Sequence, residues 1–105
     1  MPNNYFIHYE LRPAPQSENF ATTGGAFALC YVQAADAASA QIAAERYFKQ
    51  TDWIVVDLES GPEQVERTLY KDDHDMLDAY DEAMNHGECF LFHLWPSEVG
   101  GGVLH

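Results

Sequence analysis

Five segments of the chain have the residue pattern of a β-strand. Residues 5–12 alternate between apolar and polar positions, which is typical of a strand with one buried face. Residues 25–34 are apolar on both faces, as in a strand that is covered on both sides. Residues 53–60 and 88–95 alternate again, and residues 64–71 do so weakly after the turn signal Gly61-Pro62. We interpret residues 64–71 as the return strand of a hairpin, with a short helix as the alternative.

Two further segments have the period of an amphipathic helix. Residues 37–50 are rich in alanine and follow Asp36, a residue that caps helix N-termini well. Acidic residues open a second helix that continues to His86, and Gly87 suits the left-handed position after its end. The two apolar stripes are Ala40, Ala43, Ala44, Tyr47 and Phe48 in the first helix, and Met76, Leu77, Tyr80, Ala83 and Met84 in the second.

The order of these segments predicts an α+β fold. From residue 25 onward it reads strand, helix, strand, strand, helix, strand, which is the βαββαβ order of a ferredoxin-like two-layer sandwich. Right-handed crossovers then place both helices on one face of the sheet. We expect one domain over residues 1–96 with a core at about 25–96. The additional N-terminal strand at 5–12 extends an edge or pairs with another copy. Residues 13–24 form a long loop, and residues 97–105 form a flexible glycine-rich tail.

Three stretches carry a resemblance to known proteins. CYVQAADAASAQIAAE, the strand that begins at Trp53, and GECFLFHLWP together resemble small uncharacterised bacterial ferredoxin-like α+β proteins over residues 25–96. The resemblance implies a fold and no catalytic residue.

The charge of the chain restricts its partners. Among its 105 residues, 5 are Lys or Arg and 17 are Asp or Glu, which gives a net charge of −12. Nucleic acids and anionic membranes repel such a chain, so neither is expected as a partner. No apolar run is long enough to span a bilayer and no basic region opens the N-terminus, so we expect a cytoplasmic protein. Cys30 and Cys89 lie in apolar stretches and are expected to be free thiols, although a bridge between neighbouring strands stays open.

A possible acid–base site lies on the sheet face that the helices leave uncovered. The alternation places His8, His93, Glu10 and Asp57 on that face, together with Trp53 and Trp95. A histidine beside a carboxylate is the minimum for general acid–base catalysis, and aromatic side chains supply an apolar wall. The favoured alternative is that these histidines are half-buried polar groups with no catalytic role.

The second helix carries a weak candidate for a metal site. Asp78, Glu82 and His86 recur at helical spacing on its exposed side. A stable site needs ligands from more than one direction, so a solvated helix face is the favoured interpretation. No metal and no cofactor are expected.

The sequence therefore favours a non-enzymatic binding or protein-interaction domain that acts as a homodimer. Phe6, Trp53 and Trp95 are its candidate ligand or interface residues, because large apolar groups on an open sheet face need cover. One alternative is a small enzyme with a His/carboxylate site on the sheet face. Another is an acidic immunity-type partner that neutralises a basic protein.

Overall fold

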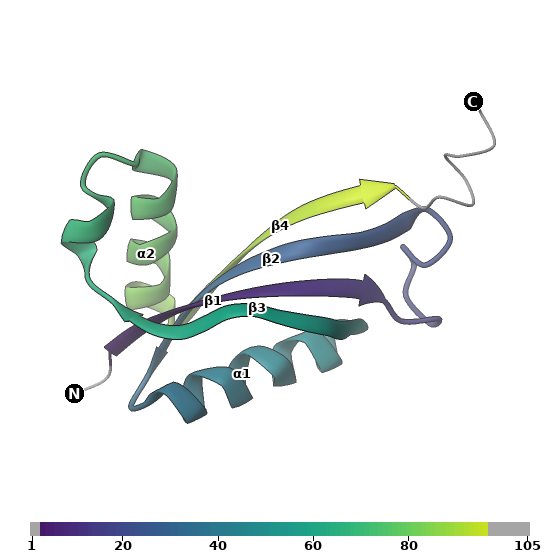
Figure 1. Cartoon of the computed structure of the whole chain (residues 1–105), viewed down its shortest axis with the longest axis horizontal. Coiled ribbons are helices and arrows are strands. Elements are labelled where there is room, and N and C mark those ends of the chain that lie inside the picture. Colours follow the sequence, from purple (N-terminus) through teal and green to yellow (C-terminus); the bar gives the residue numbers. More distant parts are fainter. Residues whose placement is uncertain (1–2, 97–105) are drawn as a thin grey trace.

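A four-stranded antiparallel sheet forms the centre of the molecule (Figure 1). The computed structural model describes residues 3–96, and its strand order is β3-β1-β2-β4. The strands are β1 (Asn3–Pro13), β2 (Thr23–Ala34), β3 (Trp53–Val65) and β4 (Glu88–Pro96). The helices are α1 (Ala37–Gln50), the short 3₁₀ helix η1 (Arg67–Tyr70) and α2 (His74–His86). The predicted α+β class is confirmed.

The first strand lies at the centre of the sheet. β1 pairs with β2 on one side and with β3 on the other. The expected position of residues 5–12 at an edge is therefore wrong. The side chains of β1 that face α1 are all buried, which is what a central strand requires. They are Tyr5, Ile7, Tyr9 and Leu11.

Helix α1 covers one face of the sheet. Its Ala40, Ala44 and Phe48 pack on the inward residues of β1 and on Ala28, Cys30 and Val32 of β2. The small alanines bring the helix close to the strands. Asp36 caps the helix as predicted, because its carboxylate accepts a 2.7 Å hydrogen bond from the Ser39 amide. The buried positions Ala40, Ala44 and Phe48 belong to the apolar stripe that the sequence predicts for this helix.

Helix α2 covers the opposite face, and only at one end. Ala79 and Ala83 pack with Tyr31 and Val65, and Phe6 and Cys89 adjoin this cluster. Neighbouring residues of a strand point to opposite faces. Because Cys30 packs under α1 and Tyr31 under α2, the two helices lie on opposite faces. The expectation that both lie on one face is wrong. Figure 1 shows α2 above one end of the sheet and α1 below it.

The third strand is longer than its sequence pattern indicates. β3 continues through Gly61-Pro62, and the expected return strand over 64–71 does not form. Residues 67–70 instead form η1, which was the alternative interpretation. Gly61 has a φ of 87°, and a Cβ there would clash with the Phe6 carbonyl oxygen. The glycine thus marks an irregularity within the strand, where the β1–β3 register shifts, rather than a turn.

The two cysteines cannot bridge within the chain. Both are free, and they belong to opposite faces of the sheet, since Cys30 packs under α1 and Cys89 beside α2. Burial raises the pKa of both thiols, which keeps them protonated.

Residues 14–22 form consecutive turns between β1 and β2, and the Ala14 amide donates a 2.9 Å hydrogen bond to the Asp52 carbonyl oxygen. The expected flexible tail at 97–105 lies outside the described residues. Within residues 3–96, no helix is long and apolar enough to cross a membrane.

Candidate binding surfaces at the two sheet edges

Helix α2 leaves part of its sheet face open. We call this part the open half-face, and its residues are His8, Glu10, Phe27, Leu29, His93 and Trp95. Leu29 and His93 lie at its border with α2. Register places Glu10, Phe27 and His93 in one row across β1, β2 and β4. Phe27 is 38% exposed although it lies on a central strand. The predicted parity of both histidines, Glu10 and Trp95 agrees with this register.

Phe27 lies between the two histidines of this face. His8 pairs with Leu29, and His93 pairs with Phe27. The two histidines therefore lie on strands that flank β2 and are offset by two residues along it. Two inter-strand spacings of about 4.8 Å separate their backbones even before that offset. The Phe27 ring centroid lies 5.3 Å from that of His8 and 5.0 Å from that of Trp95. The face therefore carries an aromatic row in place of a close histidine pair.

Of the two expected carboxylates, Glu10 lies on the same face as the histidines, whereas Asp57 lies away from His93. Asp57 pairs with Glu10 on the β3 side of the sheet, away from His93. A cavity of about 380 Å³ instead brings His93 together with Asp73 and Asp75 at the start of α2. Sequence reasoning missed this neighbourhood, because the acids are about twenty residues from His93 and only the placement of α2 brings them near.

The three aromatic interface candidates occupy three different places. Phe6 is half-buried beneath α2, with its ring centroid 5.3 Å from that of Tyr31. Trp53 packs on the α1 face, where it stacks on Phe92 at 5.7 Å. Trp95 alone lies on the open half-face, over Gly25. The expected grouping of Trp53 with Trp95 on a helix-free face is wrong, because the register shifts between β1 and β3 change the parity of β3.

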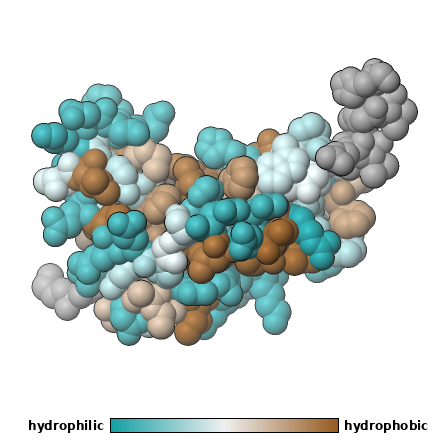
Figure 2. All heavy atoms as spheres, in the orientation of Figure 1, coloured by the Kyte–Doolittle hydropathy of each residue, from teal (hydrophilic) through white to brown (hydrophobic). Residues whose placement is uncertain are grey.

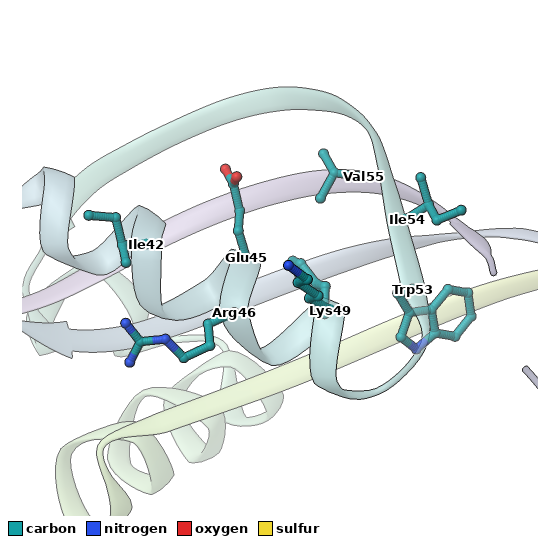
Figure 3. Close-up of a pocket in the computed structure, with 8 residues that line it drawn as sticks. Ile42, Glu45, Arg46, Lys49, Trp53, Ile54 and Val55 are labelled. Atoms are coloured by element: carbon teal, nitrogen blue, oxygen red, sulfur yellow. The ribbon is translucent and has the colours of Figure 1, made fainter. Parts of the chain in front are cut away.

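An apolar depression lies between α1 and the edge strand β3. Its volume is about 640 Å³, and Phe48, Trp53 and Val55 form its apolar floor. Figure 3 shows its outer residues, Ile42, Arg46 and Lys49 on α1 and Ile54 on β3. We call this surface, together with the adjoining Val56, the β3 surface.

The exposed groups of the β3 surface are unusually apolar. Ile42 is 58% exposed and Val56 is 50% exposed. Figure 2 shows hydrophobic atoms gathered along β3 and the adjoining part of α1. Within residues 3–96, β3 pairs with β1 alone, so its outer edge has no partner.

The charges of the β3 surface have both signs. Arg46 and Lys49 make no ion pair within the described residues. Glu45 also faces the depression, where its carboxylate accepts hydrogen bonds from the Tyr9 hydroxyl at 3.1 Å and the Gln41 amide at 2.9 Å. Burial, followed by the nearby Glu45 charge, raises the pKa of Tyr9 and keeps its hydroxyl a donor. A depression with mixed charges does not select an anion or a cation.

A second groove runs between α2 and the other edge strand, β4. It consists of two adjoining cavities of about 380 Å³ each, which share Asp75 and Leu91. We call it the α2–β4 groove. Its apolar lining is Leu29, Met76, Ala79, Cys89, Leu91 and Phe92, its acidic lining is Asp73, Asp75, Asp78 and Glu82, and His93 also lines it.

The weak metal candidates do not converge. Asp78 and Glu82 line the α2–β4 groove, whereas His86 lies one turn beyond it, with its Nε2 atom 3.7 Å from Oε1 of Glu82. Within residues 3–96, no group of three or more His, Cys, Asp or Glu side chains is placed to hold a metal ion.

No family model, curated protein or solved structure matches this chain. Its function is therefore inferred from the surfaces described above.

Proposed function

We propose that this chain is a non-enzymatic protein-interaction domain that acts as a homodimer, in which two copies pair along β3. The observation that supports this proposal is the exposed apolar edge of the β3 surface. Unpaired edge strands are sites for pairing with another chain. In β3 the bulges and acidic residues that can protect an edge lie from Val56 onward, whereas Trp53, Ile54 and Val55 pair with β1 in a regular register. The first half of β3 carries Ile54, Val55 and Val56 beside an exposed Ile42. A partner strand covers these groups.

The charges beside this edge suit a second copy of the same chain. A two-fold interface must be self-complementary. A two-fold axis between two antiparallel β3 strands brings the α1 helices of both copies to the same side of the joined sheet. Glu45, Arg46 and Lys49 all line the depression on that side. Each copy therefore offers two cations and a carboxylate to the same groups of its partner.

An enzymatic function has less support from the geometry. Phe27 lies between His8 and His93, and neither imidazole makes a side-chain hydrogen bond within residues 3–96. A general base needs a partner that orients it, and no such contact is present in that part of the chain.

Sedimentation velocity over a wide concentration range tests the homodimer. We expect a dimer for the wild type and a monomer for Ile42→Glu and Val56→Glu, because each places a charge in the apolar contact. Leu69→Glu is the matched control, since Leu69 is 67% exposed and lies in η1, thirteen residues after Val56 and beyond the opposite end of β3. A wild type that stays monomeric overturns the proposal. Dissociation by Phe27→Glu alone also overturns it, because the interface is then the open half-face.

A charge exchange tests the orientation of the two copies. Lys49→Glu is expected to weaken the dimer, and adding Glu45→Lys is expected to restore it, because both residues line the depression on the α1 side. Two-fold symmetry repeats each pair, so at about 0.2–1 kcal/mol for an exposed ion pair the loss is roughly two- to thirtyfold in Kd. If each substitution alone weakens the dimer equally and the double variant shows no recovery, the result would argue against antiparallel β3 pairing.

A further inference from the structure

The second free edge of the sheet has a chemistry opposite to that of the β3 surface. Within residues 3–96, β4 pairs with β2 alone, so its outer backbone groups are unpaired. Above this edge, Asp75, Asp78 and Glu82 follow one stripe of α2 and line the α2–β4 groove. Asp75 and Asp78 make no ion pair within the described residues. The edge thus combines free backbone groups with a row of negative charge in which Asp75 and Asp78 are unpaired within that part of the chain.

The acidic row excludes a second copy of the chain from this edge. Two copies that paired along β4 would bring their α2 carboxylates together, and the chain already carries a net charge of −12. Like charges brought together across an interface are unfavourable. Nucleic acid is excluded by the same repulsion. The occupant must therefore carry positive charge.

The lining of the groove identifies the occupant as a polypeptide. Leu29, Met76 and Leu91 form an apolar floor, which accommodates the aliphatic stems of Lys and Arg while their charged ends reach the carboxylates. On the other face of β4, the Phe90 ring stacks on Tyr47 at 4.1 Å, and both rings are partly exposed. Side chains of a strand added to β4 alternate between these two faces. One face is acidic and the other is aromatic.

We propose that the free edge of β4 and the α2–β4 groove bind an extended basic segment of another protein as an added strand. Its alternate residues are Lys or Arg, directed toward Asp75, Asp78 and Glu82. The intervening residues are apolar and pack beside Phe90 and Tyr47. Backbone hydrogen bonds to β4 supply affinity, and the alternating side chains supply specificity. The proposal does not depend on the homodimer, because it uses the opposite edge of the sheet.

Fluorescence anisotropy with a synthetic peptide tests this inference. The probe is a fluorescein-labelled, amidated Lys-Val-Lys-Val-Lys-Val-Lys peptide. Its control has the same composition in the order Lys-Lys-Val-Val-Lys-Lys-Val, which breaks the alternation. We expect the alternating peptide to bind at low ionic strength and to weaken as salt is added. Absence of binding at low ionic strength, or equal binding of both peptides, overturns the proposal.

Two pairs of neutralised acids locate the binding site. The variant Asp75→Asn/Asp78→Asn is expected to weaken peptide binding by about two- to thirtyfold, the range that two exposed ion pairs supply. The matched control, Asp57→Asn/Glu59→Gln, removes the same charge from the β3 edge and is expected to keep the affinity. Equal loss in both variants means general charge attraction and overturns the proposal.

Amide hydrogen exchange adds an independent measurement. Peptide binding is expected to slow exchange in residues 88–96 and to leave residues 53–65 unchanged. Protection of residues 53–65 instead overturns the proposal. A failed peptide result with a wild type that still sediments as a dimer removes this inference alone, so the two proposals are tested separately.

Discussion

Replacement of Phe48 by alanine is the most informative change to the folded core. Phe48 is 0% exposed, and its ring centroid lies 5.1 Å from that of Tyr9 and 5.6 Å from that of Phe90. Its ring therefore packs the C-terminal end of α1 against both β1 and β4. Truncation of a fully buried Phe costs about 3–5 kcal/mol through lost burial and the cavity that remains. Small domains are stable by about 5–15 kcal/mol, so Phe48→Ala is expected to lose a large fraction of the free energy of unfolding.

Urea unfolding followed by tryptophan fluorescence measures this loss. With a slope of roughly 1–3 kcal/mol per molar urea, a loss of about 4 kcal/mol lowers the midpoint by more than about 1 M. Phe48→Leu keeps most of the volume and is expected to cost less than about 1.5 kcal/mol. Leu69→Ala, at a 67% exposed position, is expected to stay within about 0.5 kcal/mol of the wild type. All samples are compared at one low concentration, because dimerisation adds to apparent stability. A loss below about 1 kcal/mol in Phe48→Ala would refute the packing of α1 described above.

Three further results are expected. Gly25→Ala is expected to displace the Trp95 indole, because the new Cβ would clash with that ring and would lie 2.9 Å from the Leu11 carbonyl oxygen. We expect a blue- or red-shifted Trp95 emission and a lower Tm. An unchanged emission spectrum would contradict the placement of Trp95. Arg67 donates hydrogen bonds of 2.9 and 3.2 Å to Asp81 and lowers the pKa of that carboxyl. The pair therefore stabilises the fold at any pH above the ordinary carboxyl pKa. This stabilisation is lost as the pH falls through the lowered pKa. The Tm difference between wild type and Asp81→Asn is therefore expected at neutral pH and should vanish well below about pH 3.9; a difference that persists there contradicts the assignment. Six acids between residues 72 and 82 repel one another, so moderate sodium chloride is expected to raise the Tm at neutral pH, and a fall in Tm would show that this repulsion is unimportant.

Local features of the fold could be predicted from the sequence because they depend on near neighbours. The cap at Asp36 and the left-handed Gly87, which has a φ of 96°, follow from residue type alone. The buried stripe of α1 follows from helical periodicity. In α2 the stripe was partly wrong, because Met84 is 40% exposed and the buried contact is made by Ala79. Alanine is small and only weakly hydrophobic, so Ala79 does not stand out in the hydrophobic pattern as a buried position.

Strand order and helix placement could not be predicted because they depend on distant pairing. Gly61-Pro62 has the composition of a turn, yet it accompanies a register shift inside β3, and local sequence does not distinguish the two. That misinterpretation added a strand and moved residues 5–12 to an edge. One signal for helices on both faces was present, since residues 25–34 are apolar on both sides. Covered strands have this pattern when each face meets a helix.

The candidate residues were predicted with similar limits. The shared face of His8, Glu10 and His93 follows from period-two alternation in β1 and β4, which have a regular register through β2 over these residues. Trp53 was misplaced because β3 is irregular against β1. The α2–β4 groove was not foreseen, because it joins acids of one element to apolar residues of two others.

Nuclear magnetic resonance of a dilution series tests the proposed homodimer most directly. The chain has two tryptophans, so each indole N–H signal reports on one surface. Trp53 lines the β3 surface, and Trp95 lies on the open half-face. The proposal predicts that dilution shifts the Trp53 indole signal together with the amides of residues 53–60, while the Trp95 indole signal stays in place. A Trp95 signal that moves while Trp53 stays fixed, or two signals that never move, would contradict pairing along β3.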